Sequence, residues 1–194
     1  MRVGFDIDGV LADIITAIKS YFFNGYYKIE TEDIKTYKIQ ESIPWISKEM
    51  TDDAFNNPKF YAYMKINKQA VDIINSLFDN GIVIEICTAR PFDLWETTLN
   101  WLKRKNINYT RIAFIEPKDR FDYVKQRGMR FFVEDNLETA LQLQDICKTF
   151  LVDAPYNQYS YSSNFTRIKT KKDWEMLKES VLLLDKKEQK KEIK

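Results

Sequence analysis

Histidine is absent from this sequence of 194 residues. Its absence excludes a Ser-His-Asp triad, zinc held by histidine, and phosphohistidine chemistry, because each of these needs an imidazole. Proton transfer near neutral pH must therefore use a carboxylate, or a lysine, tyrosine or cysteine whose pKa is perturbed.

Other scarce features narrow the class of protein further. Cys87 and Cys147 lack the spacing of metal ligands, and we expect both to be buried, reduced thiols of a cytosolic protein. No glycine-rich phosphate loop of the Walker or dinucleotide type is present. The chain has 30 basic and 29 acidic residues, so its net charge of +1 gives no general attraction for nucleic acid or a membrane. No apolar run has membrane-spanning length and the chain opens on a strand rather than a signal peptide, which predicts a cytoplasmic protein.

The most informative stretch present is FDIDGVLAD, residues 5–13. Its apolar residues alternate with Asp6 and Asp8, so a strand would direct both carboxylates to one side near its C-terminal end, and Gly9 permits a sharp turn beside them. Two such close carboxylates favour a hard divalent cation, of which Mg²⁺ is the most plausible. The alternative is an acidic turn that closes the strand and caps the following helix.

The rest of the chain predicts an α/β fold with one insertion. Short apolar strands alternate with helices, two of which have candidate N-caps in Asn67 and Asn136. We expect a Rossmann-like core, built from residues 1–22 and 66–185, with a parallel five-stranded sheet flanked by helices. Residues 23–65 form a small, mostly helical insertion after the first strand, and residues 186–194 form a charged tail that is solvated or frayed.

Polar residues follow four of the predicted strands. Parallel strands share one end, so these side chains should meet in a single crevice. Each also has an ordinary structural interpretation, such as a surface lysine or a turn before a helix, but together they suit phosphate and a metal ion. The residues are Asp6 and Asp8 after the first strand, Thr88 and Arg90 after the second, Lys118 after the third, and Glu134 and Asp135 after the fourth.

This ordered set resembles the four motifs of the haloacid dehalogenase (HAD) superfamily of phosphotransferases. Within the superfamily the chain is similar to the 5′(3′)-deoxyribonucleotidase family of cytosolic type C 5′-nucleotidases. The narrower resemblance is carried by the opening DIDGVLAD, the segment FYAYMKI, and the PYNQ loop that precedes a final helix with Trp174.

The resemblance implies a catalytic role for four residues. Asp6 would be the nucleophile that forms an aspartyl-phosphate, and Asp8 would be the general acid and then the general base. Thr88 and Lys118 would bind the phosphoryl oxygens and neutralise their charge.

The same resemblance implies a Mg²⁺ site and further phosphate contacts. Asp6, Asp8 and Asp135 would hold the ion, with Glu134 nearby or acting through water. Ala89 and Arg90 stand where some relatives have a second small hydroxyl residue, and Arg90 would bind phosphate or brace the Pro91 turn.

The insertion matches the small cap that closes over the site in this family. Candidate substrate-binding residues there and on the preceding helix are Ile14, Trp45, Phe60 and Tyr61. The implied activity is Mg²⁺-dependent hydrolysis of (deoxy)nucleoside monophosphates, without nucleic acid duplex or membrane as partners, and a homodimer is plausible from the resemblance.

Two alternatives stay open at this level. The phosphatase could act on a sugar phosphate, another small metabolite or a nucleic-acid end. A non-catalytic phosphate-binding or regulatory module would also use an acidic cluster with threonine and lysine.

Overall fold

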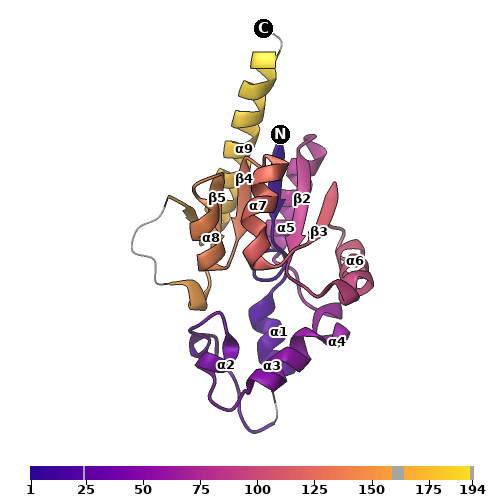
Figure 1. Cartoon of the computed structure of the whole chain (residues 1–194), viewed down its shortest axis with the longest axis vertical. Coiled ribbons are helices and arrows are strands. Elements are labelled where there is room, and N and C mark those ends of the chain that lie inside the picture. Colours follow the sequence, from indigo (N-terminus) through magenta and orange to yellow (C-terminus); the bar gives the residue numbers. More distant parts are fainter. Residues whose placement is uncertain (24, 159–163, 193–194) are drawn as a thin grey trace.

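A computed structural model describes residues 1–23, 25–158 and 164–192. Its centre is a parallel sheet in the order β3-β2-β1-β4-β5-β6 (Figure 1). This order reverses between β1 and β4, which is where doubly wound sheets bind their ligands. The strands are Arg2–Phe5 (β1), Val83–Thr88 (β2), Arg111–Phe114 (β3), Phe131–Glu134 (β4), Lys148–Val152 (β5) and Thr166–Ile168 (β6).

The predicted parallel α/β fold is confirmed, with one strand more than the five expected. The additional strand, β6, pairs with β5 through the registers Phe150↔Thr166 and Val152↔Ile168. It has only three residues and lies at the edge of the sheet. Such a short strand has too few residues to show an apolar pattern in the sequence.

Helices cover both faces of the sheet (Figure 1). In Figure 1 helices α7 and α8 lie in front of the sheet, while α5 and α9 pack together behind it. The helices are Ile14–Tyr21 (α1), Ile39–Ser42 (α2), Lys48–Phe55 (α3), Pro58–Ala62 (α4), Lys68–Asp79 (α5), Trp95–Arg104 (α6), Pro117–Arg127 (α7), Leu137–Leu143 (α8) and Lys171–Glu192 (α9), with short 3₁₀ turns at Thr31–Asp33, Phe92–Leu94 and Pro155–Asn157. None of the helices among the described residues is long and apolar enough to cross a membrane.

Both predicted asparagine caps are present. The side chain of Asn67 accepts a hydrogen bond from the backbone N–H of Ala70, and Asn136 accepts one from Thr139. Each bond satisfies a donor that the first helical turn leaves free, so the two helices begin where the sequence indicated.

Alternating side chains along the strands build a different core on each face. Phe5 and Ile86 face the side that carries α5 and α9, and they belong to the larger apolar cluster. Phe132 faces the other side, where it packs with Cys87 and Val124. Asp6, which follows Phe5, therefore points toward the α7 side of the sheet.

The predicted insertion, residues 23–65, lies at the carboxyl end of the sheet, where it contains α2, α3 and α4 (Figure 1). Its last part is tied to α6, because the indole of Trp101 donates to the carbonyl of Met64 at 2.9 Å and Arg104 donates to that of Ala62 at 2.6 Å. These bonds set the position of the insertion over the strand ends.

The predicted charged tail is solvated rather than frayed, because residues 186–191 are mostly exposed and α9 continues through Glu192. Asp185 forms an ion pair with the N-terminal amine at 3.3 Å, and Glu188 forms one with Arg130 at 3.1 Å. These contacts with the core support a helix that extends beyond the sheet in Figure 1. Residues 193–194 of the predicted tail lie outside the described residues.

Candidate active site

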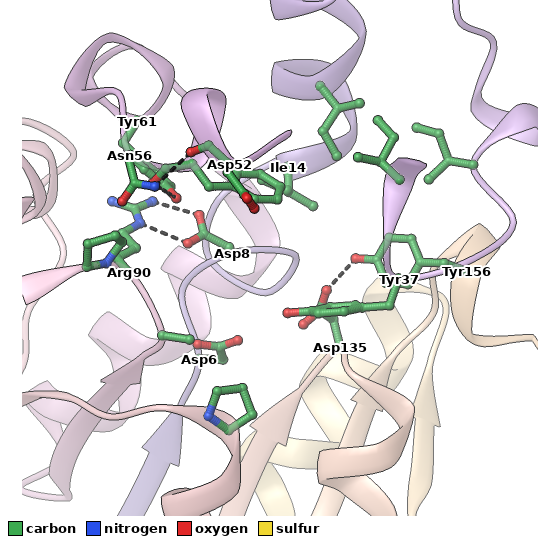
Figure 2. A pocket seen from close by; sticks show the side chains of 17 residues that line it. Asp6, Asp8, Ile14, Tyr37, Asp52, Asn56, Tyr61, Arg90, Asp135 and Tyr156 are labelled. Carbon is green, nitrogen blue, oxygen red and sulfur yellow. Dashed lines mark hydrogen bonds and ion pairs between the residues drawn. The ribbon is translucent and has the colours of Figure 1, made fainter. Parts of the chain in front are cut away.

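A cavity of about 320 Å³ lies between the carboxyl ends of the strands and the insertion. Core and insertion both contribute residues to its walls. Figure 2 shows the side chains that surround it. They belong to Asp6, Asp8, Ile14, Ile18, Ile34, Tyr37, Ile39, Asp52, Phe55, Asn56, Tyr61, Ala89, Arg90, Pro91, Pro117, Asp135 and Tyr156.

Three buried carboxylates meet at the floor of this cavity. Asp6, Glu134 and Asp135 each place an oxygen within 4.8 Å of the other two. They come from the neighbouring strands β1 and β4, as the topology requires. The predicted convergence of these acids is therefore present in the structure.

The turn after β1 brings Gly9 against this cluster. Gly9 has a φ of +83°, and a Cβ atom at this position would lie 1.9 Å from Oδ2 of Asp135. Only glycine accommodates both the left-handed backbone and the close approach of the carboxylate. The glycine of the D-x-D-G sequence is thus explained by packing against Asp135.

The three acids differ in how their oxygens are satisfied. Glu134 accepts hydrogen bonds from the backbone N–H groups of Asp135 and Asn136, each at 3.1 Å, through one oxygen. Its other oxygen binds Arg120. By contrast, Oδ1 of Asp135 is buried and has no hydrogen-bond partner among the described residues.

Arg120 is the cation of this cluster. Its side chain is 2% exposed and contacts Glu134 at 2.5 Å and Asp6 at 3.4 Å. A single guanidinium beside three carboxylates leaves an excess of negative charge in a buried place, an arrangement that a divalent cation would complete.

Burial raises the pKa values of two of these acids, Asp6 and Asp135. Desolvation raises the pKa of Asp6 to about 8, and the charges of Glu134 and Asp8 add to this while Arg120 opposes it. Desolvation, followed by the charges of Glu134 and Asp6, also raises the pKa of Asp135 well above its ordinary value. In the absence of a bound cation the cluster therefore retains protons near neutral pH.

Asp8 has a separate partner, Arg90. The guanidinium donates to both carboxylate oxygens of Asp8, at 2.8 and 2.7 Å, and lies over the rings of Tyr61 and Trp101 at 4.4 and 5.3 Å. Such a two-pronged contact fixes the orientation of the carboxylate. Figure 2 shows the pair beside Tyr61, which belongs to the insertion.

The predicted phosphate-binding residues are only partly brought together. Ala89 and Arg90 line the cavity. Thr88 is fully buried at the end of β2, where its hydroxyl accepts a hydrogen bond from the backbone N–H of Arg90 at 3.2 Å. Its hydroxyl thus braces the turn after β2, and Thr88 is not among the residues that line the cavity.

Lys118 does not reach the crevice in which we expected it. Its side chain is 72% exposed and forms an ion pair with Glu116 at 2.8 Å. Both residues lie at the start of α7, whereas Arg120, two residues further along, points inward. The helix thus presents its second basic residue to the acids.

Two of the four predicted substrate-binding residues line the cavity, namely Ile14 and Tyr61. Phe60 is instead buried in an aromatic cluster with Phe55 and Tyr61. Trp45 lines a separate groove, where it stacks on Tyr27 with ring centroids 6.0 Å apart.

Five residues at or beside the cavity were not predicted from the sequence. They are Tyr37, Asp52, Asn56, Arg120 and Tyr156. Tyr156 follows β5, so the rule that polar groups gather after parallel strands could have found it. The other residues had no comparable pattern, because their inward direction depends on how α7 and the insertion pack.

Comparisons with known proteins identify the family of this chain. The family described as 5′ nucleotidase, deoxy (Pyrimidine), cytosolic type C protein matches residues 1–185. A nucleotidase of Clostridium acetobutylicum is 26% identical over 172 residues, which cover 86% of this chain and 88% of that protein.

Solved structures share the fold at low sequence identity. A HAD family hydrolase from Deinococcus radiodurans R1, with bound phosphate and sodium, has a TM-score of 0.59 at 12% identity and covers 89% of this chain and 92% of its own. The D,D-heptose 1.7-bisphosphate phosphatase from B. bronchiseptica, complexed with magnesium and phosphate, has a TM-score of 0.53 at 10% identity, with coverages of 94% and 98%.

The fold is therefore one that hydrolases of the haloacid dehalogenase superfamily share. Because the family match extends over residues 1–185, the chain belongs to the cytosolic type C 5′-nucleotidase family. It is an enzyme of the nucleotidase class, a phosphoric monoester hydrolase, and the predicted resemblance is confirmed.

The free energy of unfolding tests whether Arg120, rather than Lys118, is the basic residue that contacts the buried acids. Arg120→Ala leaves Asp6 and Glu134 buried without their cation, so we expect the free energy of unfolding to fall by about 3–5 kcal/mol. Lys118→Ala removes an exposed ion pair and should change it by less than about 0.5 kcal/mol. Urea unfolding measures both, and equal losses would contradict the assignment of Arg120 as the buried partner.

The raised pKa of Asp6 predicts a pH dependence of stability. Between the ordinary value of 3.8 and the folded value of about 8, the folded protein binds more protons than the unfolded chain. Its free energy of unfolding therefore falls as the pH rises through this window. In EDTA, we expect the Tm to decline from about pH 4 to about pH 8, and to decline less steeply in Asp6→Asn. Parallel Tm curves for the two proteins would show that Asp6 does not hold this proton.

Proposed function

We propose that this nucleotidase hydrolyses nucleoside monophosphates, deoxyribonucleotides among them, in a Mg²⁺-dependent reaction through an aspartyl-phosphate on Asp6. The observation that carries the proposal is Oδ1 of Asp135, which is buried beside Asp6 and has no hydrogen-bond partner among the described residues. The phosphate in the Deinococcus hydrolase and the magnesium and phosphate in the B. bronchiseptica phosphatase support it by analogy of fold.

The donor set suits Mg²⁺. The ion prefers oxygen ligands and relieves repulsion among carboxylates. Asp6 and Asp135 would bind it directly, while Glu134, whose oxygens already bind Arg120 and two backbone N–H groups, would support the site from behind. When bound, the ion would supply positive charge to the phosphoryl oxygens.

Asp6 and Asp8 would have different roles in the reaction, Asp6 as the nucleophile and Asp8 as the general acid and base. A carboxylate oxygen of Asp6 attacks phosphorus, and the bond from phosphorus to the ester oxygen breaks as Asp8 gives that oxygen a proton. Asp8 then takes a proton from water, whose oxygen attacks phosphorus and releases Asp6 and inorganic phosphate. The chain has no histidine for these transfers, and Asp8 would make both because it lines the same cavity as Asp6.

Arg90 would act through Asp8. Its fork holds both oxygens of Asp8, and the ring of Tyr61 places the insertion in contact with the same guanidinium. The position of Asp8 therefore depends on closure of the cap. Ala89 is the neighbouring residue on the cavity wall and would lie against the phosphate.

The remaining walls suit an organic group larger than phosphate. Ile14, Ile34 and Tyr61 contribute apolar surface, while Asp52 of α3 and Asn56, which follows α3, add polar groups. An apolar wall with a few polar groups is the usual setting of a nucleoside, since the base has flat faces and a polar edge.

Phosphate release from a panel of substrates tests the proposed function. Ribonucleoside and deoxyribonucleoside monophosphates would be compared with sugar phosphates, in Mg²⁺ and in EDTA, with Asp6→Asn as the blank. We expect release from nucleotides only, in Mg²⁺ only, and none in the blank. Release mainly from sugar phosphates would show that the substrate is a sugar phosphate rather than a nucleotide. No release from any compound would reject the proposed phosphatase activity.

The role of Arg90 can be separated from phosphate binding by kinetics. Arg90→Lys keeps the charge but loses the fork, so Asp8 is misplaced, and we expect kcat to fall about 10²-fold while KM changes little. Arg127→Lys loses a similar fork, to the carboxylate of Glu85 outside the cavity, so it serves as the control and should leave kcat unchanged. A higher KM at unchanged kcat in Arg90→Lys would instead show that Arg90 binds the substrate phosphate.

A further inference from the structure

The two oxygens of Asp135 have different surroundings. Oδ2 accepts a hydrogen bond from the hydroxyl of Tyr156, whereas Oδ1 is buried and has no partner among the described residues. A buried carboxylate oxygen is costly unless a donor or a cation satisfies it. The tyrosine thus engages one oxygen of Asp135 and leaves the other for a different group.

Tyr156 is held firmly in the loop that follows β5. The side chain of its neighbour Asn157 donates to the carbonyls of Asp135 and Val152, at 2.7 and 2.8 Å. The amide oxygen of Asn157 accepts from the backbone N–H of Ala154 at 3.0 Å and from Arg167 at 3.0 Å. Since the same asparagine binds the backbone of Asp135, the loop and the acid are fixed relative to each other.

The insertion reaches this pair through Tyr37. The rings of Tyr37 and Tyr156 meet edge to face, with centroids 5.7 Å apart and an angle of 78° between planes. Figure 2 shows both rings beside Asp135, on the opposite side of the cavity from Asp8 and Arg90. Tyr37 therefore limits how far the ring of Tyr156 can swing away from Asp135.

We propose that Tyr156 is a positioning residue of the metal site, which orients Asp135 so that Oδ1 faces the cation, and that Tyr37 of the insertion keeps Tyr156 in place. This inference rests on the proposed function, because it requires Mg²⁺ to bind Asp135. A partner that orients a metal ligand in this way raises the affinity for the ion without touching it.

Mg²⁺ affinity of the whole protein, measured by calorimetric titration without substrate, tests the inference. Tyr156→Phe removes only the hydroxyl, and we expect Mg²⁺ to bind about 10-fold more weakly. Tyr37→Ala keeps that hydroxyl but removes the supporting ring, and it should weaken binding in the same direction by about 3-fold. Urea unfolding in EDTA checks that both variants are folded.

Tyr123→Phe is the matched control. The hydroxyl of Tyr123 donates to the buried carboxylate of Glu85 at 3.0 Å, so the same kind of bond is lost outside the cavity. The control should bind Mg²⁺ as the wild type does. If it loses affinity as Tyr156→Phe does, the effect is general and the inference fails.

The remaining outcomes separate the inference from the proposed function. If the wild type binds Mg²⁺ and Tyr156→Phe binds it equally well or more tightly, Tyr156 does not position Asp135 and the inference alone is overturned. If the wild type itself binds no Mg²⁺, the metal site of the proposed function is rejected, and the inference fails with it.

Discussion

The repulsion among Asp6, Glu134 and Asp135 is the constraint on which the site depends. Three carboxylates are buried within 4.8 Å of one another where β1 and β4 diverge. Arg120 offsets part of the charge, backbone N–H groups offset another part at Glu134, and Oδ1 of Asp135 is left without a donor among the described residues. Folding alone does not balance this cluster, and the proposed cation would do so at the place where phosphate chemistry needs positive charge.

The insertion contacts both halves of this site. On one side Tyr61 covers the guanidinium that holds Asp8, and on the other Tyr37 packs against the tyrosine that holds Asp135. The proposed acid-base group, Asp8, and the proposed metal ligand, Asp135, thus each have a partner that touches the insertion. A cap that only excluded water would not need these contacts. Closure over a substrate would therefore align the two carboxylates at the same time as it covers the cavity.

Most of the strands and the starts of two helices could be predicted from short stretches of the sequence. The strands from β1 to β5 were predicted because buried parallel strands are short, apolar and separated by helices, and the caps at Asn67 and Asn136 follow from one hydrogen bond each. The convergence of Asp6 and Asp135 needed only the knowledge that parallel strands end at one edge. The ordered motifs then indicated the superfamily and the looser motifs indicated the family, and the family match over residues 1–185 confirms the family.

Sequence by itself determined the class of fold, the acidic residues of the site and the family, because these depend on the order of residues along strands. Tertiary structure decided which side chains complete the site. Lys118 and Arg120 lie two residues apart on α7, about 200° around the helix, so packing of that helix on the sheet sends one to solvent and the other to Asp6. Packing also directs the hydroxyl of Thr88 toward the turn after β2 rather than the cavity, and it places the hydroxyl of Tyr156 against Asp135. The helix α9 likewise continues through the charged end of the chain. Such choices depend on contacts between distant segments, which no local pattern records.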